Sequence, residues 1–185
     1  MKSSAQIRGH PIHPMLVVFP VGLWITSLGF DIAYLATGNR FWYALSYWDM
    51  LAGVVGALVA AIPGFVDYFT LNLGPRARAV ATTHMALNLA AVVLFVINLV
   101  LRAAFAAANA PTFYWVSAFS IIIVLGVAAS GWLGGHLVYL EQVAVVTEPA
   151  ERARDMIVEL FGERGLAGAA GGEAPATAEK QAPDT

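Results

Sequence analysis

The stretch PMLVVFPVGLWITSLGFDIAYL, residues 14–35, decides the fold, because only one charged side chain, Asp31, interrupts 22 positions. About 20 residues of α-helix, at about 1.5 Å rise each, cross the hydrocarbon core of a bilayer. The stretch is too long for the apolar region of a secretory signal peptide, and no cleavage site follows it. It therefore predicts a membrane-spanning helix that stays in the protein.

Three further apolar stretches are long enough to span a membrane: Trp48–Leu71, Thr83–Phe105 and Tyr114–Leu140. Charged residues make up 12% of the chain, against about 25% in soluble domains. The connections are short, so neighbouring helices should be antiparallel. We expect an all-α protein in which residues 14–140 form an up-down antiparallel bundle of four transmembrane helices in the lipid bilayer.

The basic residues predict the orientation of the bundle. Six lie on one side of the four spans: Lys2, Arg8, Arg76, Arg78, Arg152 and Arg154. The other side has Arg40 and Arg102. Because basic residues stay on the cytoplasmic side of membranes, both termini should be cytoplasmic in a multi-pass protein of the bacterial inner membrane. No basic surface interleaved with aromatic residues suggests a nucleic-acid partner.

Two segments flank the spans. Residues 1–13 should be an N-terminal entry segment whose stretch 9–14 is extended, because His10 and His13 each precede a proline, which disfavours helical backbone. Residues 141–161 should include a short amphipathic helix, from Glu148-Pro149 to Phe161, that rests on the membrane, contacts a partner or stays in solvent. Residues 162–185, rich in Gly, Ala, Glu and Pro, should be disordered.

The four histidines and one aspartate predict the functional site. His10 and His13 begin the first span, Thr82 and Thr83 should cap the third with His84 in its first turn, and His136 ends the fourth. Asp67 lies near the end of the second span. Alternate helix ends face the same side, so all five should lie in one layer on the cytoplasmic side.

Steps of three and four residues from these positions follow the polar and small residues of three helices. The stripes are His13, Val17, Pro20, Trp24, Ser27 and Asp31; then Asp67, Pro63, Ala60, Gly56, Gly53 and Asp49; then His84, Asn88, Ala91, Phe95, Asn98 and Arg102. An unpaired polar group in lipid costs several kcal/mol. These stripes should therefore face the bundle interior, where Asp31, Asp49 and Arg102 should form an ion network that registers the helices or conducts protons.

The histidine layer allows three interpretations. Haem b could be ligated by His13 and His84, or by His84 and His136, with His10 as a further candidate and with Arg8, Arg76 and Arg78 at the propionates. Alternatively, His13, Asp67, His84 and His136 could hold a zinc or iron ion. The histidines could also bond only water and carbonyls at the interface. The absence of cysteine excludes thiolate ligands.

Three motifs resemble a family of bacterial predicted membrane proteins without an assigned function. They are GHPIHPMLVVFPVG at residues 9–22, IPGFVDY at 62–68 and GWLGGHLVY at 131–139, and the resemblance covers about residues 8–146. Some members are fused to Rieske iron–sulfur or c-type cytochrome domains, which implies electron transfer. The resemblance extends to His10, His13, Asp67 and His136, whereas His84 lies outside these motifs.

Together these features predict a membrane-embedded haem b protein that transfers electrons, with a quinone or a redox protein as partner. A zinc or iron site and a non-catalytic accessory subunit of a membrane complex are the alternatives. Whether the chain is an enzyme and whether it forms homo-oligomers are left open by the sequence.

Overall fold

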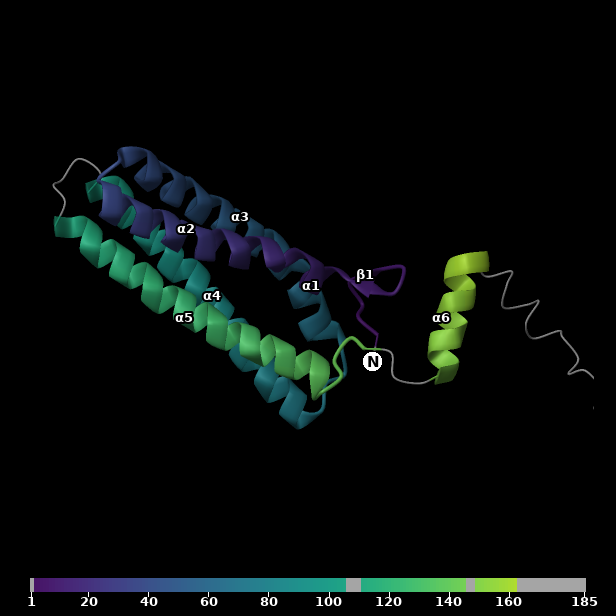
Figure 1. Cartoon of the computed structure of the whole chain (residues 1–185). Coiled ribbons are helices and arrows are strands. Elements are labelled where there is room, and N and C mark those ends of the chain that lie inside the picture. Colours follow the sequence, from purple (N-terminus) through teal and green to yellow (C-terminus); the bar gives the residue numbers. More distant parts are fainter. Residues whose placement is uncertain (1, 106–110, 146–148, 163–185) are drawn as a thin grey trace, which may run out of the picture. The chain divides into compact units, whose positions relative to one another are not determined.

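The computed structural model describes residues 2–105, 111–145 and 149–162. Residues 1–145 form one compact unit, and within it four helical stretches are long and apolar enough to span a membrane. They are α1 and α2 (Ile12–Leu16 and Val18–Thr37) taken together, α3 (Arg40–Thr70), α4 (Pro75–Phe105) and α5 (Pro111–Tyr139). The predicted all-α, four-span fold is confirmed (Figure 1).

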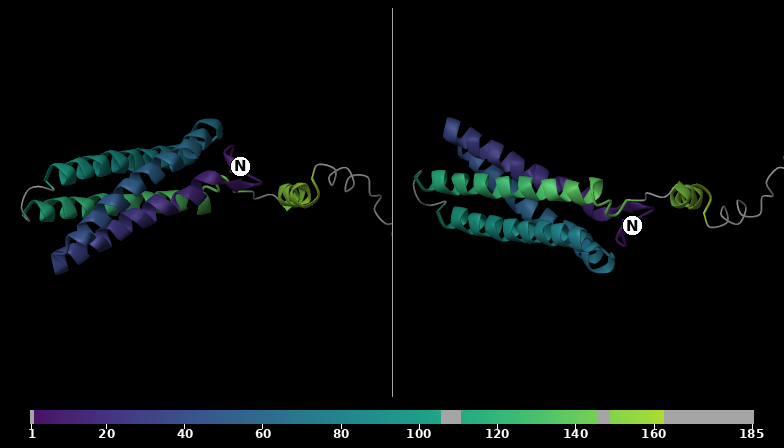
Figure 2. Two further views of the ribbon diagram at one scale, coloured as in Figure 1. Left: turned by 90° about the horizontal axis from the view of Figure 1, so that it is seen from above. Right: turned by 90° about the horizontal axis from the view of Figure 1, so that it is seen from below.

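The helices form two antiparallel hairpins, α2 with α3 and α4 with α5, as the views in Figures 1 and 2 show. Contacts also join α3 to α4 and α2 to α5, so α2 and α4 are the diagonal pair of the bundle. The start of α4 and the ends of α3 and α5 lie at the same end of the bundle as α1.

Two helices begin eight residues earlier than the apolar pattern predicts. The side chain of Asn39 accepts a hydrogen bond from the Phe41 N–H, which caps α3 before Arg40 instead of at Trp48. A proline favours the first helical position, and Pro75 starts α4. The prediction followed the longest apolar runs, whereas α4 extends into a segment that contains Arg76 and Arg78, and α3 extends into an aromatic-rich segment that starts with Arg40.

The prediction that Thr82 and Thr83 cap a helix is therefore wrong. Both lie inside α4, and their hydroxyls donate to the carbonyls of Arg78 and Ala79, one turn earlier, at 2.8 and 3.0 Å. His84 consequently lies in the third turn of α4 and not in its first. This correction moves the imidazole deeper into the bundle than the sequence suggested.

The N-terminal segment is only partly extended. Strands β1 (Gln6–Ile7) and β2 (His10–Pro11) pair antiparallel, but His13 lies within helix α1. The prediction was right for His10 and wrong for His13, because Pro14 falls in the first turn of α1, where a missing N–H leaves no helical bond unmade. α1 and α2 separate at Val17, where Pro20 cannot donate to the carbonyl of Leu16.

The interior stripes are confirmed by burial. In α2 the buried residues are Pro20, Trp24, Ser27 and Asp31, and in α4 they include Ala91, Phe95, Asn98 and Arg102. Trp24 stacks on Phe95 across the diagonal, with ring centroids 4.4 Å apart. The second unit, described by itself, contains α6 (Pro149–Phe161), which begins and ends as expected and exposes Met156, Leu160 and Phe161. The predicted disordered tail, residues 162–185, lies outside the described residues from 163 on.

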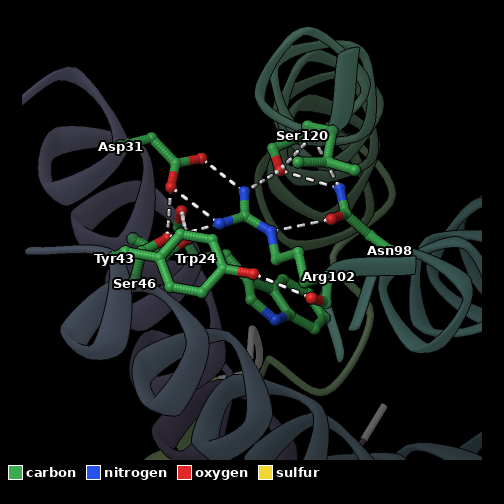
Figure 3. A network of polar contacts seen from close by, with 9 residues as sticks. Trp24, Asp31, Tyr43, Ser46, Asn98, Arg102 and Ser120 are labelled. Atoms are coloured by element: carbon green, nitrogen blue, oxygen red, sulfur yellow. Dashed lines mark hydrogen bonds and ion pairs between the residues drawn. The ribbon is translucent and has the colours of Figure 1, made fainter. Parts of the chain in front are cut away.

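A buried ion pair joins α2 to α4 at the end of the bundle away from α1. Arg102 binds Asp31 through both terminal nitrogens, at 2.8 and 2.5 Å, and both side chains are almost inaccessible. The remaining donors of the guanidinium go to Asn98 at 2.9 Å and to Ser46 and Ser120 at 3.2 Å (Figure 3). All five N–H groups therefore have acceptors.

Four helices contribute to this network, since Ser46 belongs to α3 and Ser120 to α5. The Ser46 hydroxyl donates to Asp31, and the Tyr43 hydroxyl donates to the carbonyl of Arg102. The predicted network is correct for Asp31 and Arg102. Asp49 is only partly buried and takes no part in these bonds; Ser46, one turn earlier on α3, occupies the place expected for it.

We predict that Asp31→Ala or Arg102→Ala lowers the free energy of unfolding by about 3–5 kcal/mol, because each leaves a buried charge unpaired. Titration with SDS in mixed detergent micelles measures this loss. The double variant Asp31→Arg and Arg102→Asp exchanges the two charges and should recover part of the lost stability. Asp49→Ala is the control and should change stability little. Equal losses in all three single variants would contradict the assignment of the network.

Candidate functional site

The structure brings two of the predicted ligands together, His13 of α1 and His84 of α4. Their ring centroids lie 6.3 Å apart, and the ring planes are nearly perpendicular at 87°. The pair lies at the end of the bundle that carries α1. Each imidazole is fixed by a neighbouring helix, and the way in which it is fixed determines which ring nitrogen is free.

The Nδ1 atom of His13 lies 2.8 Å from the carbonyl oxygen of Ala60 in α3. A carbonyl oxygen only accepts hydrogen bonds, so Nδ1 carries the hydrogen and Nε2 of the neutral ring keeps a lone pair. The ring lies against Gly64, one turn after Ala60, where an added Cβ would come within 2.8 Å of Nδ1. A glycine is thus required for this approach.

His84 is held in the same way by α5. Its Nδ1 lies 2.8 Å from the carbonyl oxygen of Ser130, and the ring lies against Gly134, where a Cβ would come within 3.2 Å of Cε1. The side chain of Asn88 borders the ring, with its amide nitrogen 2.8 Å from the His84 carbonyl, 2.7 Å from Ser130 Oγ and 3.2 Å from His84 Nε2. The amide has two hydrogens for these three acceptors, and the contact with the Nε2 lone pair is the longest of the three.

The two hairpins present equivalent positions across the bundle diagonal. His13 and His84, Trp24 and Phe95, and Asp31 and Arg102 are each 71 residues apart, and each pair is in contact. The carbonyls and glycines that seat the histidines, at 60 and 64 and at 130 and 134, are 70 residues apart. The equivalent residues are mostly of different types, so this repeat is not apparent from the sequence. The contacts between the hairpins show the equivalence, although the residue types do not.

Asp67 does not join the histidines. Its carboxylate accepts hydrogen bonds from the Ser3 hydroxyl at 2.7 and 2.8 Å, and from the backbone N–H groups of Ser4 and Ala5 at 2.8 and 3.0 Å. The carboxylate therefore anchors the N-terminal segment on the end of α3. The sequence predicted a metal ligand here because Asp67 lies at the same end of the bundle as the histidines, but its side chain points to the N-terminal segment.

The remaining predicted residues make other contacts. His136 Nε2 lies 3.2 Å from Glu141, which also pairs with Arg76 at 2.9 Å, and His10 is exposed with Nδ1 3.0 Å from the carbonyl of Arg8. Arg78 donates to the carbonyls of Tyr68 and Leu71 and so closes the end of α3. Within the described ranges, no three His, Asp or Glu side chains gather as metal ligands.

Sequence reasoning missed the contribution of α5. Its buried face includes Val116, Ser120, Ile123, Val127 and Ser130, in steps of four and three that lead to Gly134. The two serines on this stripe were the available signal, as polar residues are on the other helices. Of the glycines of α5, only Gly134 has a side chain against it, whereas Gly126, Gly131 and Gly135 lie against open space in the described structure.

A family model described as "Predicted membrane protein (DUF2231)" matches residues 9–147, about three quarters of the chain. The match includes His13 and His84 and all four spans. No curated protein and no solved structure matches the chain.

Gly64→Ala should displace His13 and lower the free energy of unfolding by about 1–3 kcal/mol, as overpacking does. Gly134→Ala should have a smaller effect of the same sign, because its Cβ would meet the ring at 3.2 Å instead of 2.8 Å. Gly131→Ala, in open space, is the control and should be neutral or slightly stabilising. Thermal unfolding in detergent gives the ranking, and a Gly131 effect as large as that of Gly64 would refute it.

Asp67→Ala should release the N-terminal segment, because three donors lose their only shared acceptor. Hydrogen–deuterium exchange at the Ser4 and Ala5 amides should accelerate at least tenfold, whereas the interior of α4 should exchange as before. Unchanged protection of residues 4 and 5 would show that another contact holds the segment.

Proposed function

Because the chain belongs to the DUF2231 family of predicted membrane proteins, and because two imidazoles face each other inside its bundle, we propose that His13 and His84 are the axial ligands of a haem b used for electron transfer. The chemistry that this group supplies when bound is one-electron reduction and reoxidation at iron. The protein contributes the ligands, their orientation and a low-dielectric surrounding.

The geometry of the two rings supports this proposal. A metal bound to two nitrogens at about 2.0–2.1 Å each holds those nitrogens about 4 Å apart, and the ring centroids, about 1 Å behind them, about 6 Å apart. The observed separation of the centroids is 6.3 Å. Metal-bound histidines usually donate the other ring N–H to a carbonyl or carboxylate, and both rings here donate Nδ1–H to a carbonyl.

The number of ligands favours haem over a bare zinc or iron ion. A structural zinc site takes four protein ligands and a catalytic one takes three. The described part of the chain offers only the two imidazoles at this position, with Asp67 and His136 engaged elsewhere. A haem supplies four equatorial nitrogens and needs two axial ligands, which is the number available.

Small side chains between the histidines and the aromatic stack also favour a planar group. His13 and Trp24 are eleven residues apart, or about 16 Å along a helix. The interior residues of this interval include Pro20, Ala60 and Ala91, all buried. Small interior residues are what a macrocycle edge requires within a bundle.

The depth of the histidines in the bundle suggests which kinds of redox partner could reach them. We place the haem near the cytoplasmic side of a bacterial inner membrane, where the positive-inside rule puts the ends that carry the histidines. A lipid-soluble quinone and a water-soluble redox protein are the reaction partners that such a position serves. Arg76 pairs with Glu141 and Arg78 donates to the carbonyls that end α3, so of the three arginines expected at the propionates we keep Arg8 as the candidate.

The test is the visible spectrum of the purified protein expressed with sufficient haem. Wild type should show a Soret band and reduced α and β bands of six-coordinate haem, and His13→Ala and His84→Ala should each lose at least tenfold in haem content. His10→Ala and His136→Ala are the controls and should retain it. About one zinc or iron per chain without haem would favour the metal site, and no bound cofactor would favour the accessory subunit.

A further inference from the structure

The two imidazoles are equivalent in position but not in surroundings. Position 60, whose carbonyl receives the His13 N–H, is alanine, whereas the equivalent position 130 is serine. The Ser130 hydroxyl oxygen lies 3.0 Å from Nδ1 of His84, in addition to the Ser130 carbonyl at 2.8 Å. One turn after each histidine, the first hairpin has Val17 and the second has Asn88.

Asn88 determines how the Ser130 hydroxyl is used. The Asn88 amide nitrogen can only donate, and it lies 2.7 Å from Ser130 Oγ. The hydroxyl hydrogen must then point elsewhere, and the His84 carbonyl, 3.3 Å from Oγ, is within reach. Oγ therefore faces the Nδ1–H of His84 as a second acceptor. Among the described residues, the Ala60 carbonyl is the one hydrogen-bond partner of the His13 ring.

We propose that Ser130, oriented by Asn88, is a positioning residue that shares the Nδ1 hydrogen of His84 and makes His84 the more electron-donating axial ligand. The proposal rests on the proposed haem function. A hydrogen bond to the distal nitrogen raises the basicity of a ligating imidazole, and a stronger donor stabilises the oxidised iron. Ser130 thus lowers the reduction potential of the site.

The equivalence of the hairpins provides a matched set of variants. Ser130→Ala removes the second acceptor and should raise the midpoint potential, and Ala60→Ser supplies one to His13 and should lower it. The double variant should return towards the wild-type potential. Ser117→Ala is the control, because it also removes a buried hydroxyl from α5, one that has no hydrogen-bond partner among the residues that the structure describes. Its potential should equal that of wild type.

Redox titration followed by the Soret band measures these shifts. A purely structural role for Ser130 would reduce haem content or thermal stability and leave the potential in place. Equal potentials in all variants, with haem retained, would overturn the inference and leave the haem site intact. Absence of haem from wild type would instead contradict the proposed function.

Histidine ¹⁵N NMR of the haem-free protein tests the same contact without a cofactor. The Nδ1–H hydrogen of His84 should be more deshielded than that of His13, and Ser130→Ala should remove most of the difference. Finding the hydrogen on Nε2 of His84, or a spectrum unaffected by Ser130→Ala, would refute the shared hydrogen bond whatever the haem content.

Discussion

A polar group inside a bilayer has no water to bond, so it must find its partner within the protein. This constraint organises the whole bundle. It places Asp31 opposite Arg102, provides an acceptor for every N–H of the guanidinium, and brings Ser46 and Ser120 to the same point from the other two helices. It also directs the histidines inward, where the carbonyls of Ala60 and Ser130 receive their N–H groups. The absence of water in the bilayer therefore accounts both for the polar contacts between the helices and for the inward orientation of the histidines.

The two hairpins contribute residues at approximately equivalent positions to the interior of the bundle. Three side-chain pairs lie along the diagonal between the first and third spans: a charge pair, an aromatic stack and an imidazole pair. The charge pair neutralises the buried charges and fixes the register of the helices, the aromatic stack fills the middle of the bundle, and the imidazole pair lies at the end that carries α1. Equivalent positions differ in residue type, as at Ala60 and Ser130. In the proposed haem site this difference would make the two histidines unequal ligands.

Much of the fold could be predicted from the sequence, because a lipid bilayer requires long apolar helices with their polar residues on the interior face. Length and apolarity gave the four spans, and the three-and-four spacing placed Trp24, Asp31, Phe95 and Arg102 correctly in the interior. The helix starts could not be predicted from apolarity, since α3 and α4 continue through polar residues. Asp67 and His136 lie at the expected end of the bundle but point to Ser3 and Glu141. The directions of these two side chains depend on contacts with the N-terminal segment and with the turn after α5. Such contacts cannot be predicted from the periodicity of a helix.

The central claim is that two nearly perpendicular imidazoles on diagonal helices share one iron. Low-temperature electron paramagnetic resonance of the oxidised protein tests it most directly, because the angle between axial ring planes governs the anisotropy of low-spin ferric haem. We predict a highly anisotropic low-spin signal, as perpendicular planes produce. A high-spin haem signal, or the signal of iron without a porphyrin, would contradict the account.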